Sequence, residues 1–338
     1  ARMLIGWIVL ICAEFFSGAS LRMGLWHPWT LIVTYWLYFS HFFLFTTLAV
    51  RTRRTSLASL YLWGVLFGLY ESWVTKVIWH GYSGDGKFVL GSIGPFGFSE
   101  ISMVLLFHPV MSFLVPLAVA CLLWPSLRSL FPDLARFTGR SLSARLVRYY
   151  IIFSFVPIIV MNSGGPLNLI ANLIVAAMVM FILVQMARPT FALPDARCVV
   201  VFSRTGLIGL CVYIGLLYVV TYSGLRPEGL PSMSVQLFTI LFYAVIIFGL
   251  WQHTETKLPQ TDAPQTSARE LKTILTSLAT LLLLALAFSP LAGWPGLFAP
   301  ILPNFCVWTP LGVLLTVAAL YRGRGGQEGL RTSDFQQP

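Results

Sequence analysis

Charge is scarce in this chain of 338 residues. Asp, Glu, Lys and Arg make up 10% of it, whereas hydrophobic residues make up 57% and the mean hydropathy is +0.80. A soluble domain of this length would need more charge to cover its surface. The composition therefore excludes an ordinary soluble protein and predicts an all-α, polytopic transmembrane helical bundle.

Familiar catalytic and cofactor motifs are also missing. The sequence contains no HExxH zinc motif, no GxSxG nucleophile turn and no CxxCH haem site. It has five cysteines but no CxxC pair, so neither a zinc site nor a disulfide framework is indicated. No cofactor is predicted on this basis. Whether the protein is an enzyme stays open at this stage.

What the chain does contain is a series of apolar runs. A helix of ~20 apolar residues crosses the roughly 30 Å of hydrocarbon in a bilayer. We expect about ten such helices: Met3–Leu21, Pro28–Val50, Ser56–His80, Glu100–Trp124, Tyr149–Met161, Pro166–Met186, Val199–Tyr222, Ser232–Trp251, Thr273–Phe288 and Asn304–Tyr321. The first run also resembles a signal peptide, but Glu14 within it argues against that reading.

The net charge of +10 follows the topology and does not indicate a nucleic-acid partner. With ten helices, the strongly basic loops all fall on one side of the membrane, where the positive-inside rule expects them. These loops are 51–54, 125–148, 187–204, 252–272 and 322–324. The pattern predicts a multi-pass protein of the cell membrane with both termini cytoplasmic.

The chain divides into four expected segments. They are residues 1–124 with the polar groups, a basic cytoplasmic loop at 125–148, a scaffold half at 149–321 and a polar disordered tail at 322–338. Apolar residues recur at helical spacing in the basic loop, which predicts a helix lying on anionic lipid of the cytoplasmic face. A solvated loop that only sets topology is the alternative. The lipid-binding candidates are Arg128, Arg136, Arg140, Arg145 and Arg148.

Ionisable residues concentrate in the expected first four helices, and four of them, one on each helix, lie away from the helix ends: Glu14, His41, Glu71 and His108. Such groups cost ~2.5–3.5 kcal/mol each on insertion scales, so they persist where they are paired, cavity-facing or functional. All four come to similar depths, and we interpret them as a candidate proton, ion or acid–base cluster. A divalent metal held by His41, Glu71 and His108 is possible, although the spacing does not require one.

The third expected helix has a face of small and polar residues. Gly64, Gly68, Glu71 and Thr75 follow one another at helical spacing. The two glycines form a small-xxx-small surface, so the glutamate should face other helices and not lipid. Lys76, in contrast, is expected to extend to the outer interface.

The fourth expected helix contains Pro109 directly after His108, and Pro116 two turns later. Each proline frees the backbone carbonyl four residues earlier, at Leu105 and Ser112. A freed carbonyl at membrane depth needs a partner. Single histidines such as His41 are also common as hydrogen-bonded core residues, which is the structural alternative for this group.

A glycine-rich loop at residues 81–99 joins these two helices on the outer side. It matches most of a P-loop, but Phe88 stands where a magnesium-binding Ser or Thr is needed. We expect a lid over the four-helix cluster, built around Gly81, Asp85, Gly86 and Lys87. A re-entrant plug and a plain flexible connection are the alternatives.

Three functions fit these features. The first is a small-solute or ion transporter, coupled to protons or cations through the intramembrane carboxylates. The second is a membrane-embedded enzyme with a Glu/His site facing the outer leaflet. The third is a non-catalytic subunit or scaffold, in which buried polar groups only fix helix packing.

Overall fold

The computed structural model describes residues 1–81, 88, 90–134, 144–253 and 268–333. In its first half the elements are α1 (Arg2–Leu10), η1 (Ile11–Phe15), η2 (Thr30–Thr34), α2 (Tyr35–Arg51), α3 (Leu57–Gly68), α4 (Tyr70–Trp73), α5 (Val77–His80), β1 (Ser92–Ile93), β2 (Phe96–Gly97), α6 (Phe98–Ser102), η3 (Met103–Leu114), α7 (Val115–Leu123) and η4 (Pro125–Ser129). The segments η1, η2 and η3 are π-helical, and η4 is a 3₁₀ turn.

In the described residues of the second half, the regular elements are helices and 3₁₀ turns. They are α9 (Ala144–Asn162), α10 (Pro166–Ala187), η5 (Arg188–Thr190), α11 (Arg197–Val200), α12 (Arg204–Gly224), η6 (Pro227–Gly229), α13 (Met233–Gln252), α14 (Ala268–Phe288), η7 (Ser289–Leu291), η8 (Pro295–Leu297) and α15 (Phe298–Ser333). The only strands in the described part are β1 and β2, an antiparallel pair with Ser92 opposite Gly97.

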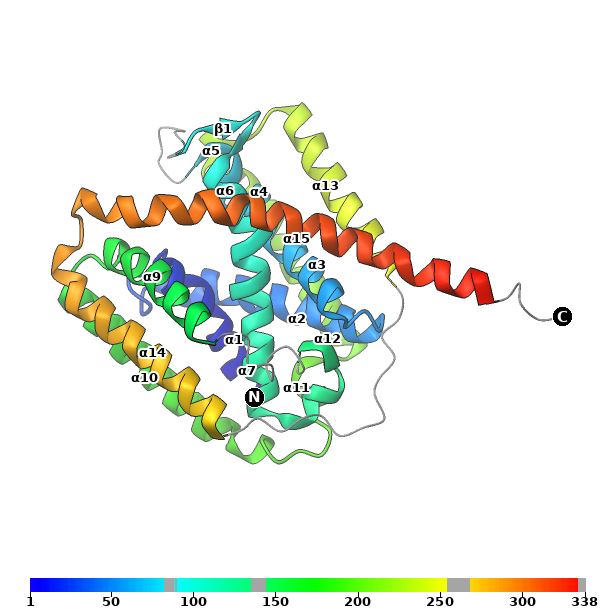
Figure 1. The fold of residues 1–338 in the computed structure, drawn as a ribbon, viewed down its shortest axis with the longest axis horizontal. Helices are drawn as coiled ribbons and strands as arrows, with labels where there is room; N and C mark the ends of the chain where they lie inside the picture. Colours follow the sequence, from blue (N-terminus) through cyan, green and yellow to red (C-terminus); the bar gives the residue numbers. More distant parts are fainter. Residues whose placement is uncertain (82–87, 89, 135–143, 254–267, 334–338) are drawn as a thin grey trace.

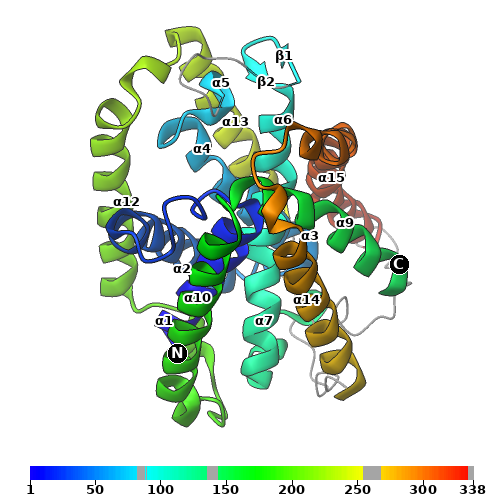
Figure 2. The same ribbon diagram turned by 90° about the vertical axis from the view of Figure 1, so that its left-hand side faces the viewer.

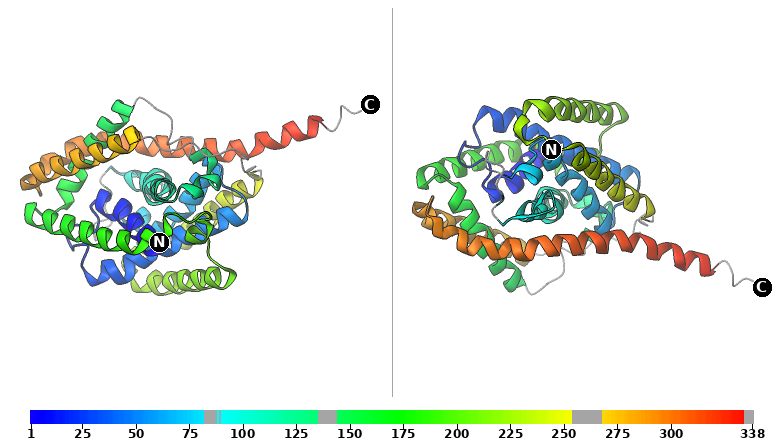
Figure 3. Two further views of the ribbon diagram at one scale, coloured as in Figure 1. Left: turned by 90° about the horizontal axis from the view of Figure 1, so that it is seen from below. Right: turned by 90° about the horizontal axis from the view of Figure 1, so that it is seen from above.

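The helix formed by α6, η3 and α7 is the centre of the bundle. It runs from top to bottom in Figure 1 and is seen end-on in the middle of both views in Figure 3, with other helices around it. Of an 18-residue apolar stretch within Phe98–Leu123, 61% is buried, against 11% for the corresponding stretch within Pro166–Thr190 of α10 and η5. Figure 2 places α10, α12 and α14 around this centre, while α15 crosses the upper part of the bundle in Figure 1. The first half therefore supplies most of the core.

The outer helices present large apolar side chains to the surroundings. Leu167, Val219 and Met233 each keep more than two thirds of their surface exposed. In water such a surface would drive aggregation, whereas in a bilayer it contacts lipid. Six helices of the described part are long and apolar enough to span a membrane, and two shorter apolar helices accompany them. The all-helical membrane architecture is thus confirmed, while ten spans and the cytoplasmic placement of both termini remain predictions.

The closest approach in the core joins α3 to η3. A Cβ at Gly64 would lie 2.6 Å from the Cα of Pro109, and one at Gly68 would lie 2.8 Å from the carbonyl oxygen of Val104. No side chain fits at either position, so the expected small-residue packing surface is confirmed. The Leu105 carbonyl also has the partner it was expected to need, because the Tyr61 hydroxyl donates to it.

The third expected helix is not continuous. It ends at Gly68, resumes for one turn as α4 and again as α5, and Lys76 between these turns adopts a left-handed φ of 58°. The expectation that Lys76 extends to the interface is wrong. Its side chain is fully buried, and Nζ donates to the carbonyls of Thr221 (3.1 Å) and Leu225 (2.6 Å) at the end of α12. Carbonyls left open at a helix C-terminus attract a cation, which explains this position.

Two further expectations differ from the structure. Helix α15 continues to Ser333, although the sequence predicted a disordered tail from residue 322. Extending a helix that has already formed requires no new nucleation step, so polar residues can continue α15 beyond its apolar part.

Arg128, expected at the lipid surface, is buried and donates from Nε to the Cys121 carbonyl at 3.2 Å. The side chains of Arg136, Arg140, Arg145 and Arg148 lie outside the described part.

The α3–η3 contact yields a stability prediction. Gly64→Ala should lower the free energy of unfolding by about 1–3 kcal/mol, because the methyl group would overlap backbone atoms of Pro109. Gly215→Ala on α12 is the matched control, since nothing lies within 4 Å of its added Cβ. Thermal unfolding of both variants in one detergent measures the difference. Equal melting temperatures for the two variants would contradict the close packing.

Candidate functional site

Glu71 and His108 form a buried pair at the centre of the bundle. The distance between Glu71 Oε1 and His108 Nε2 is 3.1 Å, and the two side chains are 8% and 2% exposed. They come from α4 and η3; α4 follows α3, the helix that packs on η3 through the glycine contacts described above. A charge in such surroundings is stable only when it is paired and hydrogen-bonded, and this contact provides both conditions.

The break after α3 determines what surrounds Glu71. The backbone at Leu69 has ψ of −9°, which ends the regular helix and starts α4 on a new course. Both Tyr70 and Glu71 consequently face His108, although neighbouring residues of one regular helix point about 100° apart. Glu71 Oε2 accepts a hydrogen bond from the Thr75 hydroxyl. Both carboxyl oxygens therefore have a hydrogen-bond partner.

His108 lies within the π-helical segment η3, directly before Pro109. Its Nδ1 is 2.8 Å from the Ser112 hydroxyl, which can donate to this nitrogen or accept from it. The imidazole can accordingly be neutral or protonated while keeping partners on both nitrogens. Short π-helical insertions are frequent at functional sites, and Glu14 also lies in one, η1.

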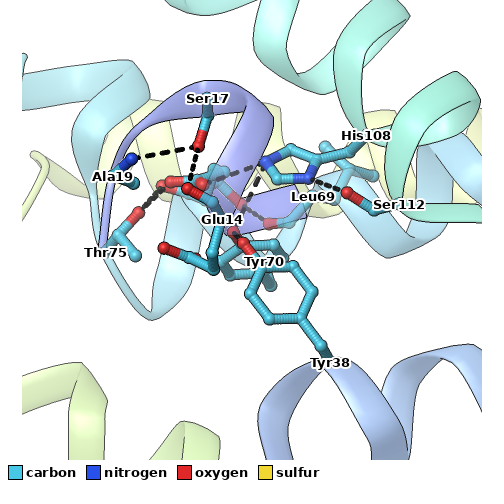
Figure 4. Close-up of polar contacts among 11 residues, drawn as sticks. Glu14, Ser17, Ala19, Tyr38, Leu69, Tyr70, Thr75, His108 and Ser112 are labelled. Atoms are coloured by element: carbon cyan, nitrogen blue, oxygen red, sulfur yellow. Dashed lines mark hydrogen bonds and ion pairs between the residues drawn. The ribbon is translucent and has the colours of Figure 1, made fainter. Parts of the chain in front are cut away.

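Two tyrosines connect this pair to the second buried glutamate (Figure 4). The Tyr70 hydroxyl is 3.4 Å from His108 Nε2 and 2.7 Å from the Tyr38 hydroxyl. The Tyr38 side chain also lies near the carboxyl group of Glu14. Glu14 Oε2 also accepts from the Ser20 hydroxyl at 2.6 Å. The hydrogen-bonded network thus runs from Glu71 and His108 through both tyrosines, and its Tyr38 end lies beside Glu14.

The network contains more acidic than basic side chains. Glu14 and Glu71 are 7% and 6% exposed, and His108 is the one basic side chain bonded within the network. With both carboxyl groups ionised, even a protonated imidazole leaves an excess negative charge in a low-dielectric core. A bound proton or another cation removes that excess. The arrangement is therefore suited to hold a proton or cation, and the tyrosine hydroxyls link the two acids.

His41 lies close to the network but is bonded separately. Its Nδ1 is 2.7 Å from the Leu37 carbonyl, which can only accept, so Nδ1 carries a proton. Its Nε2 is 3.1 Å from the Tyr218 hydroxyl. The ring of Phe67 stands between His41 and His108, nearly parallel to both, at centroid distances of 5.3 and 6.2 Å. The four predicted residues are thus gathered in one region, with Glu71 and His108 bonded in the network, Glu14 beside its Tyr38 end, and the His41 ring packed against Phe67 and Tyr70.

Several residues of the network were not predicted from the sequence. Tyr70, Ser20 and Ser112 of the network, and Tyr218 beside His41, carried no signal beyond being polar. The segment that carries Ser20 is held by asparagines of α10, which were assigned to a scaffold. Asn168 and Asn172 both donate to the Leu21 carbonyl, at 2.6 and 3.0 Å, and Asn172 Oδ1 accepts from the Leu25 amide.

The structure offers no support for the metal alternative. Glu71 and His108 bond each other while His41 bonds Leu37 and Tyr218. No group of three or more Asp, Glu, His or Cys that could hold a metal occurs in the described ranges.

Of the residues proposed to form a lid, Asp85, Gly86 and Lys87 lie outside the described ranges. Gly81 ends α5 with φ of 68° and is buried.

A double-mutant cycle tests the central pair. Glu71→Gln or His108→Gln alone should cost roughly 3–5 kcal/mol of stability, because each leaves a buried partner uncompensated. The double variant should cost less than the sum of the two by about 1–3 kcal/mol. Unfolding in detergent measures all four proteins, and His27→Gln, at an exposed histidine, is the control. Strictly additive losses would show that the two groups do not interact.

Comparison with known proteins agrees with this architecture. Residues 3–323 match a family described as an uncharacterized membrane protein family. An uncharacterized protein from Archaeoglobus fulgidus is 24% identical over 251 residues, which cover 73% of this chain and 75% of that protein. No solved structure matches the chain. With almost its whole length matched, the chain belongs to this family of membrane proteins.

Proposed function

We propose that the protein is a small-solute or ion transporter of the cell membrane, coupled to protons or cations through its intramembrane carboxylates. The observation that carries the proposal is the buried network from Glu14 through Tyr38, Tyr70 and His108 to Glu71. Intramembrane acids and histidines joined in this way are typical of proton relays in pumps and transporters. Substrate and coupling-ion sites in transporters also tend to use interrupted helices.

The interrupted backbone around the network supports this proposal. Glu14 and His108 lie on π-helical segments, and Glu71 lies on a single turn between two breaks. Backbone of this kind is tolerated at membrane depth where other groups satisfy its polar atoms. Continuous helices would serve a purely structural bundle equally well, so the breaks favour a function that needs movement or proton exchange.

The contacts also allow a structural alternative. Every carboxyl and imidazole group of the network has a hydrogen-bond partner within the protein. A subunit whose polar groups only fix helix packing would have the same contacts. The experiment must therefore distinguish a network that exchanges protons from one that never changes its protonation.

Proteoliposomes containing a pH-sensitive dye provide this test. A potassium diffusion potential is imposed, and amino acids, sugars, carboxylates, phosphate and sodium are added one by one. We expect at least one solute to change the internal pH, because its uptake moves protons through the network. Glu71→Gln should abolish the proton movement, since it removes a titrating group. Asp195→Asn, at an exposed carboxyl far along the chain, is the control.

The outcomes separate the two functions. Solute uptake that ignores a pH gradient, and that is unchanged in Glu71→Gln, would contradict coupling through this pair. Wild-type vesicles that move no solute, from a protein that purifies with a single membrane partner, would support the structural subunit instead. Equal retention of variant and wild type in gel filtration excludes misfolding as the cause of any loss.

A further inference from the structure

A second polar cluster lies next to the network, at the end of the bundle that carries β1 and β2. Lys76 and His80 are four residues apart and face Gly229 of η6. A Cβ at Gly229 would be 3.2 Å from the Cβ of His80 and 3.5 Å from that of Lys76. Arg226, three residues earlier, donates from Nη1 to the Thr75 carbonyl at 3.3 Å. Three basic side chains therefore meet where α5 and η6 pack together.

Donors in this cluster remain unused. His80 Nε2 and Arg226 Nη2 are both shielded from solvent, and neither has a hydrogen-bond partner in the described part of the chain. Leaving a buried polar group unsatisfied is unfavourable, and native structures rarely do so without reason. The Lys76 ammonium has three N–H donors, and its two carbonyl partners occupy two of them. Arg226 Nη2 and the third N–H of Lys76 are therefore available to a ligand, and His80 Nε2 is a further donor when it carries a proton.

The cluster also has more positive than negative charge. Among the residues that the structure describes, the carboxyl group that contacts the cluster is that of Glu228, whose Oε1 is 3.7 Å from Arg226 Nε and whose side chain is 49% exposed. Lys76 and Arg226 thus share one partly solvated acid, while Lys76 itself is fully buried. An anion would offset the remaining charge and accept from the free donors at the same time.

The backbone holds both cations in an uncommon conformation. Lys76 has φ of 58° and Arg226 has φ of 51°, in the left-handed region that is unfavourable for residues with a side chain. Conformations of this kind cluster at ligand clamps and switch regions. A ligand can still reach the cluster from solvent, since the Arg226 side chain is 21% exposed.

We propose that Lys76, His80 and Arg226 form a binding site for a phosphate group. A tetrahedral phosphate presents several acceptor oxygens in different directions, which suits donors that arrive from α5 and η6, and arginine is especially suited to it. The group belongs either to a water-soluble phosphate or to the headgroup of a phospholipid. This site goes beyond the proposed function, because binding here does not depend on transport through the glutamates.

The test measures binding to the purified full-length protein in detergent. Two probes are titrated separately, inorganic phosphate and a short-chain phosphatidylglycerol, against chloride at equal ionic strength. We expect one or both to raise the melting temperature saturably. Arg226→Gln and His80→Gln should each weaken binding roughly tenfold, as expected for loss of one charge-assisted contact. A response to phosphate alone indicates a soluble ligand, and a response to the lipid alone indicates a headgroup.

Two further variants distinguish a lost contact from a general effect on charge or folding. Arg22→Gln, at an exposed arginine, should bind both probes like wild type. Arg226→Lys keeps the charge but not the forked geometry, so it should fold and bind more weakly even if the glutamine variant is unstable. The proposal is overturned if neither probe shifts wild type beyond chloride, or if the shift persists unchanged in both Arg226 variants and in His80→Gln.

Discussion

The contact between Glu71 and His108 depends on how closely two helices approach. Gly64 and Gly68 let α3 rest on the backbone of η3, and only at that separation can a carboxyl group on α4 reach an imidazole on η3. Burial makes the pair necessary, since an isolated charge in this core would be costly. The glycines, the interrupted helices and the surrounding hydroxyl groups can all be understood as consequences of keeping this pair inside the bundle.

Part of this arrangement could be predicted because it follows from local rules. The spacing of Gly64, Gly68 and Glu71 fixes one helix face, and Pro109 fixes which carbonyl is freed, so the packing surface and the Leu105 partner both follow. The helix break at Leu69 follows from no such rule. It turns Tyr70 toward His108, and helical periodicity would place that side chain elsewhere.

Contacts between residues far apart in the sequence explain why the positions or roles of several side chains were predicted wrongly. Lys76 was expected at the interface because its length permits that position, but the open carbonyls of α12, almost 150 residues away, provide a buried one. Asn168 and Asn172 were assigned to a scaffold half, yet they hold the segment that carries Ser20 to Glu14. The two halves therefore cooperate: the first supplies the ionisable groups, and the second determines where several of their neighbours lie.

The account rests on the claim that the network holds an exchangeable proton. Infrared difference spectroscopy on the reconstituted protein after a pH change tests this most directly, because a protonated carboxylic acid has its own carbonyl stretch. The account predicts such a band in wild type, altered in Glu14→Gln and in Glu71→Gln and unchanged in Asp195→Asn. A wild-type spectrum in which no buried carboxyl group changes protonation across the accessible pH range would contradict it.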